Sequence, residues 1–588
     1  MTGIVQGVGF RPFVHGLAEG LGLDGFVGND GRGVFVEIEG EPETVRKLVA
    51  EIERHPPPLA VLERVTAREI RPTGTDGFSI VPSVVSGAAS GTGAGRTDTL
   101  ISSDTATCGD CLAELRDPTG RRYRYPFVNC TNCGPRFTIV TGVPYDRPST
   151  TMAGFPMCTA CAREYHDPTD RRFHAQPTCC PSCGPTPVLL DAEGGPRAVD
   201  DPIAAAAAEL RNGAVLAIKG LGGFHLAALA GGPVGESAVA ALRARKHRED
   251  KPFAVLVADL DAARELVEVG PADGPAARLL RSRRRPIVLL PRRTPPDATR
   301  LAPQVAPGNS SVGVMLPYTP LHHLLMDVLS ISGTEPIVLT SGNVSDEPIA
   351  YRDDEVVQRL RGIADGYLTH DRPIHVRADD SVARVVLGHT IPVRRSRGYA
   401  PEPLRLRHPA RRPLLGCGAE LKSTFCLARG GHAFLSQHIG DLENYETLRS
   451  YTTGIEHFTT LFDAEPELLV HDLHPEYLST KYAREQAEER GVELLGVQHH
   501  HAHLASCLAD NGRTEADGPV IGIACDGLGY GCDRQLWGGE VMAVSPARFE
   551  RLAHLEPVPM PGGAAEPAHR GRRLPSVPPM DRPPDLPD

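Results

Sequence analysis

The alternation of hydrophobic and polar positions differs from one part of the chain to the next, and the first part predicts a small α+β unit. Apolar residues recur at helical spacing over 11–22 and 42–54, whereas 33–40 alternates like a half-buried strand. A further strand is predicted over 61–70. The order suggests β-α-β-β-α-β, a ferredoxin-like arrangement whose first strand is cut short by the start at Met1.

Two larger regions alternate helical and strand patterns, which predicts α/β domains. The first has predicted helices at 202–211 and 236–247 and predicted strands at 214–220 and 253–258. The second begins near 413 and has predicted strands at 468–472, 493–498 and 519–527. After Gly563 the chain is rich in Pro and Arg and has no core pattern.

These patterns divide the chain into several parts. The predicted parts are an α+β domain (1–82), a Gly/Ser/Thr-rich linker (83–107), a cysteine-rich domain (108–186), an α/β domain (200–402), a last α/β domain (412–563) and an aberrant tail (564–588).

Composition excludes some classes of protein. A net charge of −11 argues against a protein that binds mainly nucleic acid, and no apolar run approaches the length of a membrane span. Without a signal segment, the protein is predicted to be cytoplasmic, where thiols stay reduced. We therefore interpret the 14 cysteines as metal ligands, nine of them within residues 108–183.

The cysteine-rich domain is an internal repeat with a uniform offset of 50 residues. Each copy has two Cys-x2-Cys turns separated by 18 residues, a spacing that suits a closed tetrahedral zinc site. The offset makes Cys180, and not Cys179, the partner of Cys130. We assign one zinc to Cys108, Cys111, Cys130 and Cys133, and the other to Cys158, Cys161, Cys180 and Cys183. Exchanged pairing between the copies remains an alternative, as do free or redox-active thiols.

A Gly-rich turn, "GIVQGVGFR", runs from the first strand into the first helix. The backbone amides of Gln6, Gly7, Val8, Gly9 and Phe10 are candidates for phosphate binding at this helix N-terminus, with Arg11 completing the site. Asn29, at the end of the next strand, is a candidate for orienting an attacking water. The alternatives are a structural turn and an ordinary turn asparagine.

In the first α/β domain, polar residues flank predicted strands, where nucleotides bind in open α/β sheets. The nucleotide candidates are Lys246, Arg248 and Lys251 before one strand, and Thr340, Ser341 and Asn343 after another. The alternative is a set of solvated helix-end charges.

The last domain contains "VQHHHAHLAS", in which His499 and His503 are four residues apart. On a helix this spacing places both imidazoles on one face, where they can share a transition metal. Asp526, in the Gly-rich stretch "CDGLGYGCD", is a candidate third ligand, and with Gly527 and Gly529 a candidate for nucleotide binding. The alternatives are solvated histidines and a turn-starting aspartate.

In this order, the segments from Met1 to about Gly563 resemble the HypF family of hydrogenase-maturation carbamoyltransferases. The resemblance implies an acylphosphatase-like domain, tandem zinc fingers, a YrdC-like domain and an actin/hexokinase-type (ASKHA) domain. Arg11 would then bind the acyl phosphate of carbamoyl phosphate, and Asn29 would position water. Lys219 and His225, in "IKGLGGFHL", join the nucleotide candidates of the YrdC-like domain, which would make carbamoyl adenylate from ATP.

The resemblance also implies cofactors and a partner. These are two structural zinc ions, ATP with Mg²⁺, a further zinc or iron ion at His499 and His503, and the protein HypE, whose C-terminal cysteine accepts the carbamoyl group. Family members continue differently after "PGG", so we expect a partial ASKHA domain and an impaired transfer step. The competing hypotheses are a tRNA threonylcarbamoylation enzyme, a zinc-finger protein that binds nucleic acid, and a non-functional product that folds only in its middle domains.

Overall fold

The computed structural model describes residues 1–30, 33–81, 100–143, 145–293, 301–330, 335–344 and 347–556. Its contacts divide the chain into two compact units, Met1–Gly496 and Val497–Asp588, which are described separately below. The predicted linker from 83 to 99 and the predicted tail from 564 to 588 lie outside the described residues. Each helix within the described ranges is too short or too polar to cross a bilayer.

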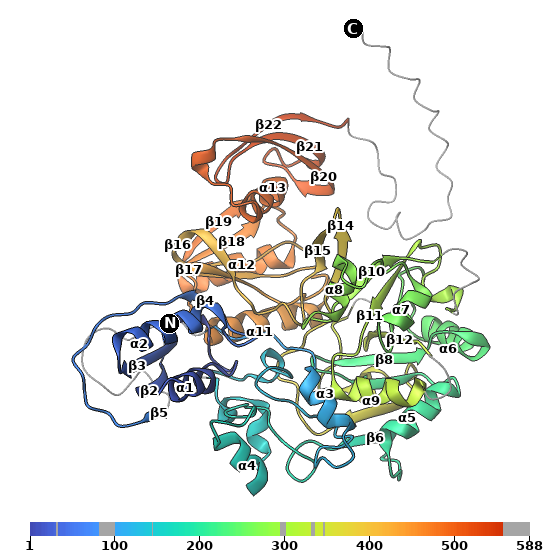
Figure 1. Cartoon of the computed structure of the whole chain (residues 1–588). Helices are drawn as coiled ribbons and strands as arrows, with labels where there is room; N and C mark the ends of the chain where they lie inside the picture. The colour runs from blue at the N-terminus through green and yellow to red at the C-terminus, as the bar shows by residue number, and fades with distance from the viewer. Residues whose placement is uncertain are drawn as a thin grey trace. The chain divides into compact units, whose positions relative to one another are not determined.

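The N-terminal domain, dark blue in Figure 1, has the predicted order of elements with one additional strand. The elements are β1 (Thr2–Ile4), α1 (Phe10–Gly20), β2 (Asp24–Asp30), β3 (Gly33–Glu39), α2 (Pro42–Arg54), β4 (Val61–Arg64) and β5 (Phe78–Ile80). β1 pairs with β4, and β2 lies between β3 and β5 in a second sheet. Phe10, Val14 and Ala18 of α1 are buried in the core with Val27 of β2.

The predicted strand over 61–70 is wrong in its length, because β4 ends at Arg64. β4 pairs with the short β1 only over Val61 to Arg64, and residues 66–70 are exposed and form no strand. The short β5 was not predicted, because three residues are too few to show a period.

The cysteine-rich domain contains little regular structure besides α3 (Gly109–Arg116) and α4 (Thr159–His166), which occupy equivalent places in the two copies. Each helix begins directly after the first cysteine of its copy, Cys108 or Cys158. Residues 100–107 were predicted to end the linker, but they are buried, and Thr107 N–H donates to the carbonyl of Tyr318. They therefore form part of the folded unit.

The first α/β domain is built on a mixed ten-stranded sheet (Figure 1, teal to yellow). Its strand order is β15-β14-β10-β11-β9-β12-β8-β7-β13-β6. The strands are β6 (Pro187–Asp191), β7 (Leu216–Lys219), β8 (Phe224–Leu229), β9 (Ala254–Leu256), β10 (Ile287–Pro291), β11 (Ser311–Met315), β12 (Ile337–Ser341), β13 (Gly366–His370), β14 (Val382–Val386) and β15 (His389–Arg394). All residues of β8 are buried, because both faces of the sheet are covered.

The helices of this domain are α5 (Pro202–Arg211), α6 (Gly232–Arg245), α7 (Leu260–Leu266), α8 (Pro275–Arg281), α9 (Pro320–Leu329) and α10 (Val356–Arg359). The helix predicted at 236–247 begins earlier, since Pro233 in its first turn is compatible with a helix start. The domain also begins before the predicted 200, because β6 pairs with β13. That pairing could not be inferred from the local pattern.

The last part of the first unit is a four-stranded sheet of order β17-β16-β18-β19. Its elements are β16 (Leu404–Gly416), β17 (Cys426–Leu435), α11 (Tyr445–Leu461), β18 (Leu468–Asp472), α12 (Leu478–Arg490) and β19 (Glu493–Val497). The predicted strands at 468–472 and 493–498 are confirmed, whereas the domain begins at Leu404 and not at 412.

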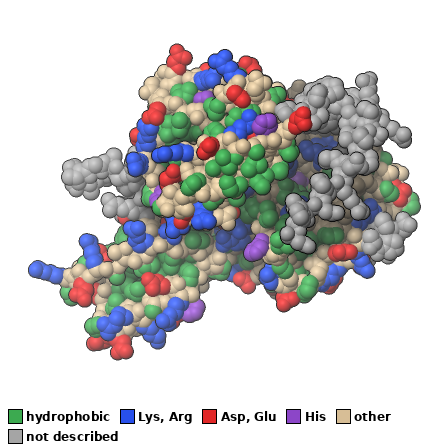
Figure 2. All heavy atoms as spheres, turned by 90° about the horizontal axis from the view of Figure 1, so that it is seen from above, with side chains coloured by type: hydrophobic (Ala, Val, Ile, Leu, Met, Phe, Trp, Pro, Cys, Tyr) green, Lys and Arg blue, Asp and Glu red, His purple; other side chains and the backbone are tan. Residues whose placement is uncertain are grey.

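The second unit contains α13 (His499–Asp510) and a sheet of β20 (Val520–Tyr530), β21 (Leu536–Val544) and β22 (Phe549–His554). The strand predicted at 519–527 is longer in the structure, because β20 continues to Tyr530 with an irregular register between Cys525 and Gly529. A bulge lets a strand continue through glycines. Ile521 and Ile523 are exposed, and Figure 2 shows hydrophobic side chains gathered within one area of the face it presents.

Candidate active sites and metal centres

The Gly-rich turn forms a buried loop between β1 and α1. Gly7 and Gly9 have φ values of 69° and 74°, which favour glycine, and Gly9 caps α1. A Cβ at Gly7 would lie 2.8 Å from the Tyr145 ring, so this backbone approaches the cysteine-rich domain too closely for a side chain. Arg11 lies in the first turn of α1 and is 8% exposed. The predicted phosphate-binding residues therefore lie together at one helix N-terminus.

Asn29 lies near this loop, because it belongs to β2 and α1 packs against β2. The Gln6 Nε2 donates to the carbonyls of Asp30, at 2.9 Å, and Gly33, at 3.2 Å, and so ties the loop to the β2–β3 turn. Asn29 is buried, and its Oδ1 has no hydrogen-bond partner among the described residues. A buried carbonyl oxygen without a partner is costly, which makes it a candidate acceptor for a bound water or substrate.

The guanidinium of Arg11 faces the second copy of the cysteine repeat. Its Nη2 lies 3.5 Å from His174 Nδ1. Burial lowers the pKa of Arg11, and the charges of Asp146 and Tyr165 partly offset this. The sequence pattern had not singled out these residues of the cysteine-rich domain, although His174 departs from the repeat, which has Arg124 at the equivalent position.

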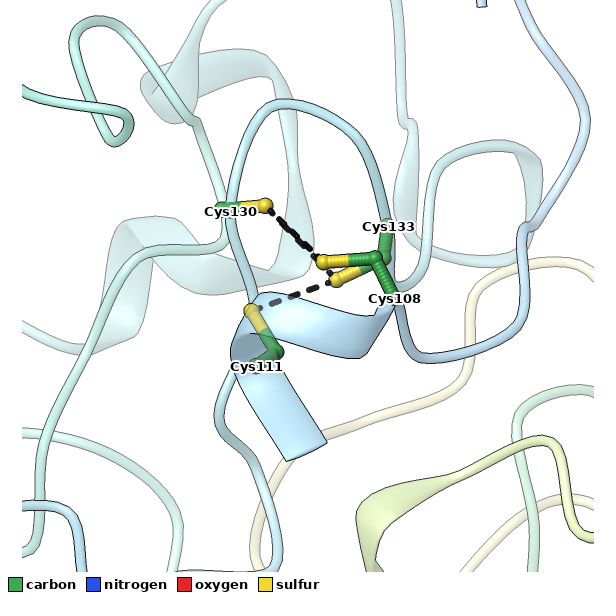
Figure 3. A group of neighbouring side chains, drawn as sticks. All are labelled: Cys108, Cys111, Cys130 and Cys133. Atoms are coloured by element: carbon green, nitrogen blue, oxygen red, sulfur yellow. Dashed lines mark hydrogen bonds between the residues drawn. The ribbon is translucent and has the colours of Figure 1, made fainter. Parts of the chain in front are cut away.

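The cysteines cluster within each copy, as predicted, and not between copies. In the first cluster the Sγ atoms of Cys108 and Cys130 lie 3.6 Å apart, and those of Cys111 and Cys133 lie 3.5 Å apart (Figure 3). Thiolates bound tetrahedrally to one zinc ion lie about 3.8 Å apart, so this cluster fits a closed structural site.

The second cluster repeats this geometry. The Sγ of Cys158 lies 3.7 Å from that of Cys180, and the Sγ of Cys183 lies 3.6 Å from that of Cys161. Cys179 belongs to neither cluster, and its Sγ lies 3.6 Å from the Tyr125 hydroxyl. The offset of 50 residues thus identified the correct cysteine of the adjacent pair.

Arginines of each copy contact the metal cluster of the other copy. The Arg171 Nη1 lies 3.0 Å from Cys111 Sγ, and the Arg121 Nη1 lies 3.4 Å from Cys161 Sγ. Guanidinium groups in these places offset the negative charge of four thiolates on one divalent ion. The repeat displayed these arginines in the sequence, but only the fold shows that they cross between copies.

Two glutamates also form ion pairs between the copies, each with arginines of the other copy; these pairs are called the arginine–glutamate exchange below. Glu164 accepts from Arg122 Nη2 at 2.6 Å, and Glu114 forms short ion pairs with Arg171 and Arg172. Burial raises the pKa of Glu164, but hydrogen bonds from Arg122 and Arg121 outweigh it and lower that pKa to about 2. Both carboxylates are therefore charged at neutral pH.

Three predicted nucleotide residues converge at the end of β12. The Lys246 Nζ, at the end of α6, donates to the carbonyls of Ser341, at 2.9 Å, and Asn343, at 2.5 Å. The Ser341 Oγ donates to Asn343 Oδ1 at 2.8 Å. Thr340 is buried in β12 just before them, so Thr340 and Ser341 belong to the strand and do not follow it.

Arg248 and Lys251 occupy the loop after α6. Arg248 donates from Nε to the carbonyl of Lys251 at 2.9 Å, and its guanidinium lies 5.0 Å from the centre of the Phe253 ring. Lys251 is exposed.

Lys219 and His225 belong to the paired strands β7 and β8. His225 is the register partner of Ser341, so it lies beside the Lys246 cluster. Its Nε2 lies 2.9 Å from Asp380 Oδ2, and Lys219 Nζ lies 2.6 Å from Asp353 Oδ1. Both side chains already have acidic partners, and a nucleotide would have to share them.

A cavity of about 510 Å³ has Val344, the residue after Asn343, in its lining, but not Asn343, Ser341 or Lys246 themselves. It lies within the first unit and is also lined by Arg359, Arg377, Arg449 and His457. Its volume falls in the range of small-molecule sites. The sequence pattern had not singled out these arginines, because they come from distant segments of the chain.

The histidine pair and Asp526 form a third candidate metal centre, within the second unit. Asp526 Oδ2 lies 3.0 Å from His499 Nε2 and 3.3 Å from His503 Nε2. Two nitrogens and one oxygen suit zinc or iron and leave a position open. His500 and His501 are buried and point elsewhere: His501 Nε2 lies 3.1 Å from the carbonyl of Ser545.

The two glycines near Asp526 have different surroundings. The Gly527 N–H donates to Asp526 Oδ1 at 2.7 Å, which helps to orient the carboxylate. A Cβ at Gly529 would lie 2.5 Å from His500 Cε1, so close packing of β20 on α13 requires glycine there.

Family models match successive parts of the chain. They are described as acylphosphatase (residues 1–80), HypF finger (107–140 and 157–190), telomere recombination (208–396), HypF Kae1-like domain (409–510) and the second subdomain of the carbamoyltransferase Kae1-like domain (522–575).

Relatives match almost the whole chain. Carbamoyltransferase HypF2 of Cupriavidus necator is 48% identical over 577 residues, which are 96% of this chain and 69% of that protein. HypF of Synechocystis is 43% identical over 558 residues, 95% of this chain and 69% of that protein. The crystal structure of full-length HypF in its phosphate- and nucleotide-bound form has a TM-score of 0.87 and 44% identity, and covers 94% of this chain and 69% of that chain.

The fold, the sites and these relatives define an ATP-dependent carbamoyltransferase that carries an acylphosphatase domain, a YrdC-like domain and tandem zinc fingers. The chain belongs to the HypF carbamoyltransferase family. The resemblance inferred from the order of motifs is confirmed.

Proposed function

We propose that this chain carries out three successive steps in the maturation of [NiFe] hydrogenases. The acylphosphatase domain hydrolyses carbamoyl phosphate to carbamate and phosphate. The YrdC-like domain joins carbamate to Mg²⁺-bound ATP, giving carbamoyl adenylate and pyrophosphate. The Kae1-like region passes the carbamoyl group from the adenylate to the C-terminal cysteine of HypE and releases AMP, and the resulting thiocarboxamide is the precursor of cyanide.

The observation that carries this proposal is the buried pairing of a phosphate loop with Arg11 at one helix N-terminus. The loop amides and the guanidinium suit the phosphate dianion, whose charge they bind without reorganisation. The Asn29 Oδ1, which has no partner among the described residues, can accept a hydrogen bond from a water molecule and so orient that water toward the bound acyl phosphate.

The second step is supported by the Lys246, Ser341 and Asn343 cluster, which lies in the same compact unit as Arg11. The Lys246 ammonium is a point charge suited to phosphate oxygens, and the adjoining cavity is large enough for a nucleotide. Enclosure matters because carbamate decomposes in water.

The third step is supported by the open set of His499, His503 and Asp526. A zinc or iron ion bound there would supply a Lewis acid for the transfer.

The 14 cysteines are free of disulfides, which supports a reducing, cytoplasmic setting.

ATP–pyrophosphate exchange by the purified chain, with and without carbamoyl phosphate, tests the first two steps. We expect exchange that depends on carbamoyl phosphate and is lost in Arg11→Ala. Lys246→Ala should lose exchange but still release phosphate, while Asp526→Asn should keep both and lower only the carbamoylation of HypE, measured by mass spectrometry. Exchange at the same rate with and without carbamoyl phosphate would contradict the proposed order of steps.

A further inference from the structure

The cysteine-rich domain covers the phosphate loop directly. Gly7 lies against the ring of Tyr145, and a Cβ at Gly9 would lie 3.1 Å from Thr131 Oγ1. Thr131 Oγ1 in turn donates to the carbonyl of Arg171, at 3.1 Å, in the second copy. The loop is therefore bounded by the first copy and by the segment between the copies, and the second copy supports Thr131 from behind, whereas the loop's own domain supplies Arg11 and Asn29.

His174 is the residue of this cover that meets Arg11. Its Nδ1 lies 3.5 Å from Arg11 Nη2, and its ring stacks on Tyr165 with the centroids 4.8 Å apart. The Tyr165 hydroxyl donates to Gln176 Oε1 at 2.7 Å, and Gln176 Nε2 lies 3.4 Å from Asp146 Oδ1. Because Gln176 is almost fully buried, this chain of contacts holds the imidazole in place.

The backbone of the repeat directs the imidazole. His174 has φ 51° and the equivalent Arg124 has φ 55°, a left-handed conformation that the shared turn imposes on both copies. A histidine in this region carries a conformational cost, which the surrounding packing must offset.

The imidazole is neutral at physiological pH. Burial, with the charges of Arg11 and His166, lowers the pKa of His174 to about 4. A neutral ring can present Nδ1 as an acceptor to the guanidinium, with its proton on Nε2.

We propose that His174 is a positioning residue of the acyl phosphate site: its Nδ1 accepts from Arg11 and sets the plane of the guanidinium toward the phosphate loop. The inference rests on the proposed function and adds that the second zinc-finger copy completes this site. A rotated guanidinium would bind the phosphate with fewer N–H groups. Loss of the His174 acceptor is therefore expected to raise mainly KM.

Three substitutions that tolerate a left-handed backbone test this role in the full chain. His174→Asn keeps an acceptor near the position of Nδ1, His174→Gly removes it, and His174→Asp adds a carboxylate that competes with phosphate for Arg11. Phosphate release from carbamoyl phosphate should stay within about threefold of wild type in H174N, while KM rises about tenfold or more in H174G and H174D. Zinc content verifies that the module is intact in each variant.

Asn and Asp have the same shape, so a folding defect would affect H174N and H174D alike. Equal KM values for those two variants, or a wild-type KM in H174G, would overturn the inference. Arg11→Ala separates this result from the parent proposal. If R11A hydrolyses carbamoyl phosphate normally, the proposed function fails; if R11A is inactive and H174G is normal, only the role of His174 fails.

Discussion

The two copies of the cysteine repeat share a scaffold but differ in what they touch. Both keep four clustered thiols and arginines that reach the other copy's cluster. At the left-handed position, the first copy has Arg124, whose Nη2 lies 2.9 Å from the exposed Asp201, and the second has His174, beside Arg11. Leu115 and Pro126 of the first copy are likewise replaced by Tyr165 and Gln176, which support His174.

The difference teaches that metal chemistry and recognition are separable in this module. The thiols and the arginine–glutamate exchange determine where the left-handed residue lies, and they are the same in both copies. The side chain at that residue can change without disturbing the cluster, so Arg124 meets Asp201 of the α/β domain whereas His174 meets Arg11.

The largest expected effect comes from removing one buried ligand in each copy. Cys111→Ser and Cys161→Ser should each lower the zinc content from about two to about one per chain. C161S should also lower phosphate release from carbamoyl phosphate by about 100-fold, because it releases the segment that holds His174, and C111S by about tenfold. Atomic absorption and phosphate assays measure both, and equal losses of activity would refute the division of roles.

The next largest effect concerns the glutamates that the copies exchange. Glu114→Gln and Glu164→Gln each remove one carboxylate partner of the buried Arg122 and of the arginines beside it, and should lower the free energy of unfolding by about 3 kcal/mol. Denaturant unfolding measures this, with Asp261→Asn, at an exposed ion pair, as a control that should not change stability. A loss in one copy only would show that the scaffold is not symmetric.

A smaller effect is expected from acidification, which should destabilise wild type more than a variant that lacks the imidazole of His174. Because the pKa of His174 falls from 6.5 to about 4 on folding, its neutral form is favoured in the folded state. The contribution of His174 to the free energy of unfolding is therefore fully present above pH 6.5 and is lost as the pH falls from 6.5 toward 4. Between about pH 7.5 and about pH 5.5, wild type should lose about 1 kcal/mol more than His174→Asn. Identical losses in thermal unfolding would contradict the pKa shift.

The smallest effect belongs to the first copy. Arg124→Asn keeps the left-handed backbone and removes only an exposed ion pair with Asp201, so stability should change by less than about 0.5 kcal/mol. Phosphate release should equal that of wild type. A rise in KM for Arg124→Asn as large as that for H174G would show that phosphate binding depends equally on both copies.

Spacing along the chain predicted those parts of the sites that are local. Three residues between His499 and His503, and two between paired cysteines, bring donors together within a turn or a helix, and the structure has these groups as predicted. The strand predicted at 519–527 was too short, because glycines favour a turn while the pairing of β20 with β21 extends the strand through them to Tyr530.

The sequence by itself determined the order of domains, the ligands of both zinc clusters and the helix that carries Arg11. Each depends on residues near one another in the chain or on a repeat that can be aligned with itself. Only the tertiary structure decided that Arg171 serves the other copy's Cys111 and that His174 meets Arg11, 163 residues away. Such contacts arise from the packing of separately folded segments, and no local period or propensity records which surfaces will meet.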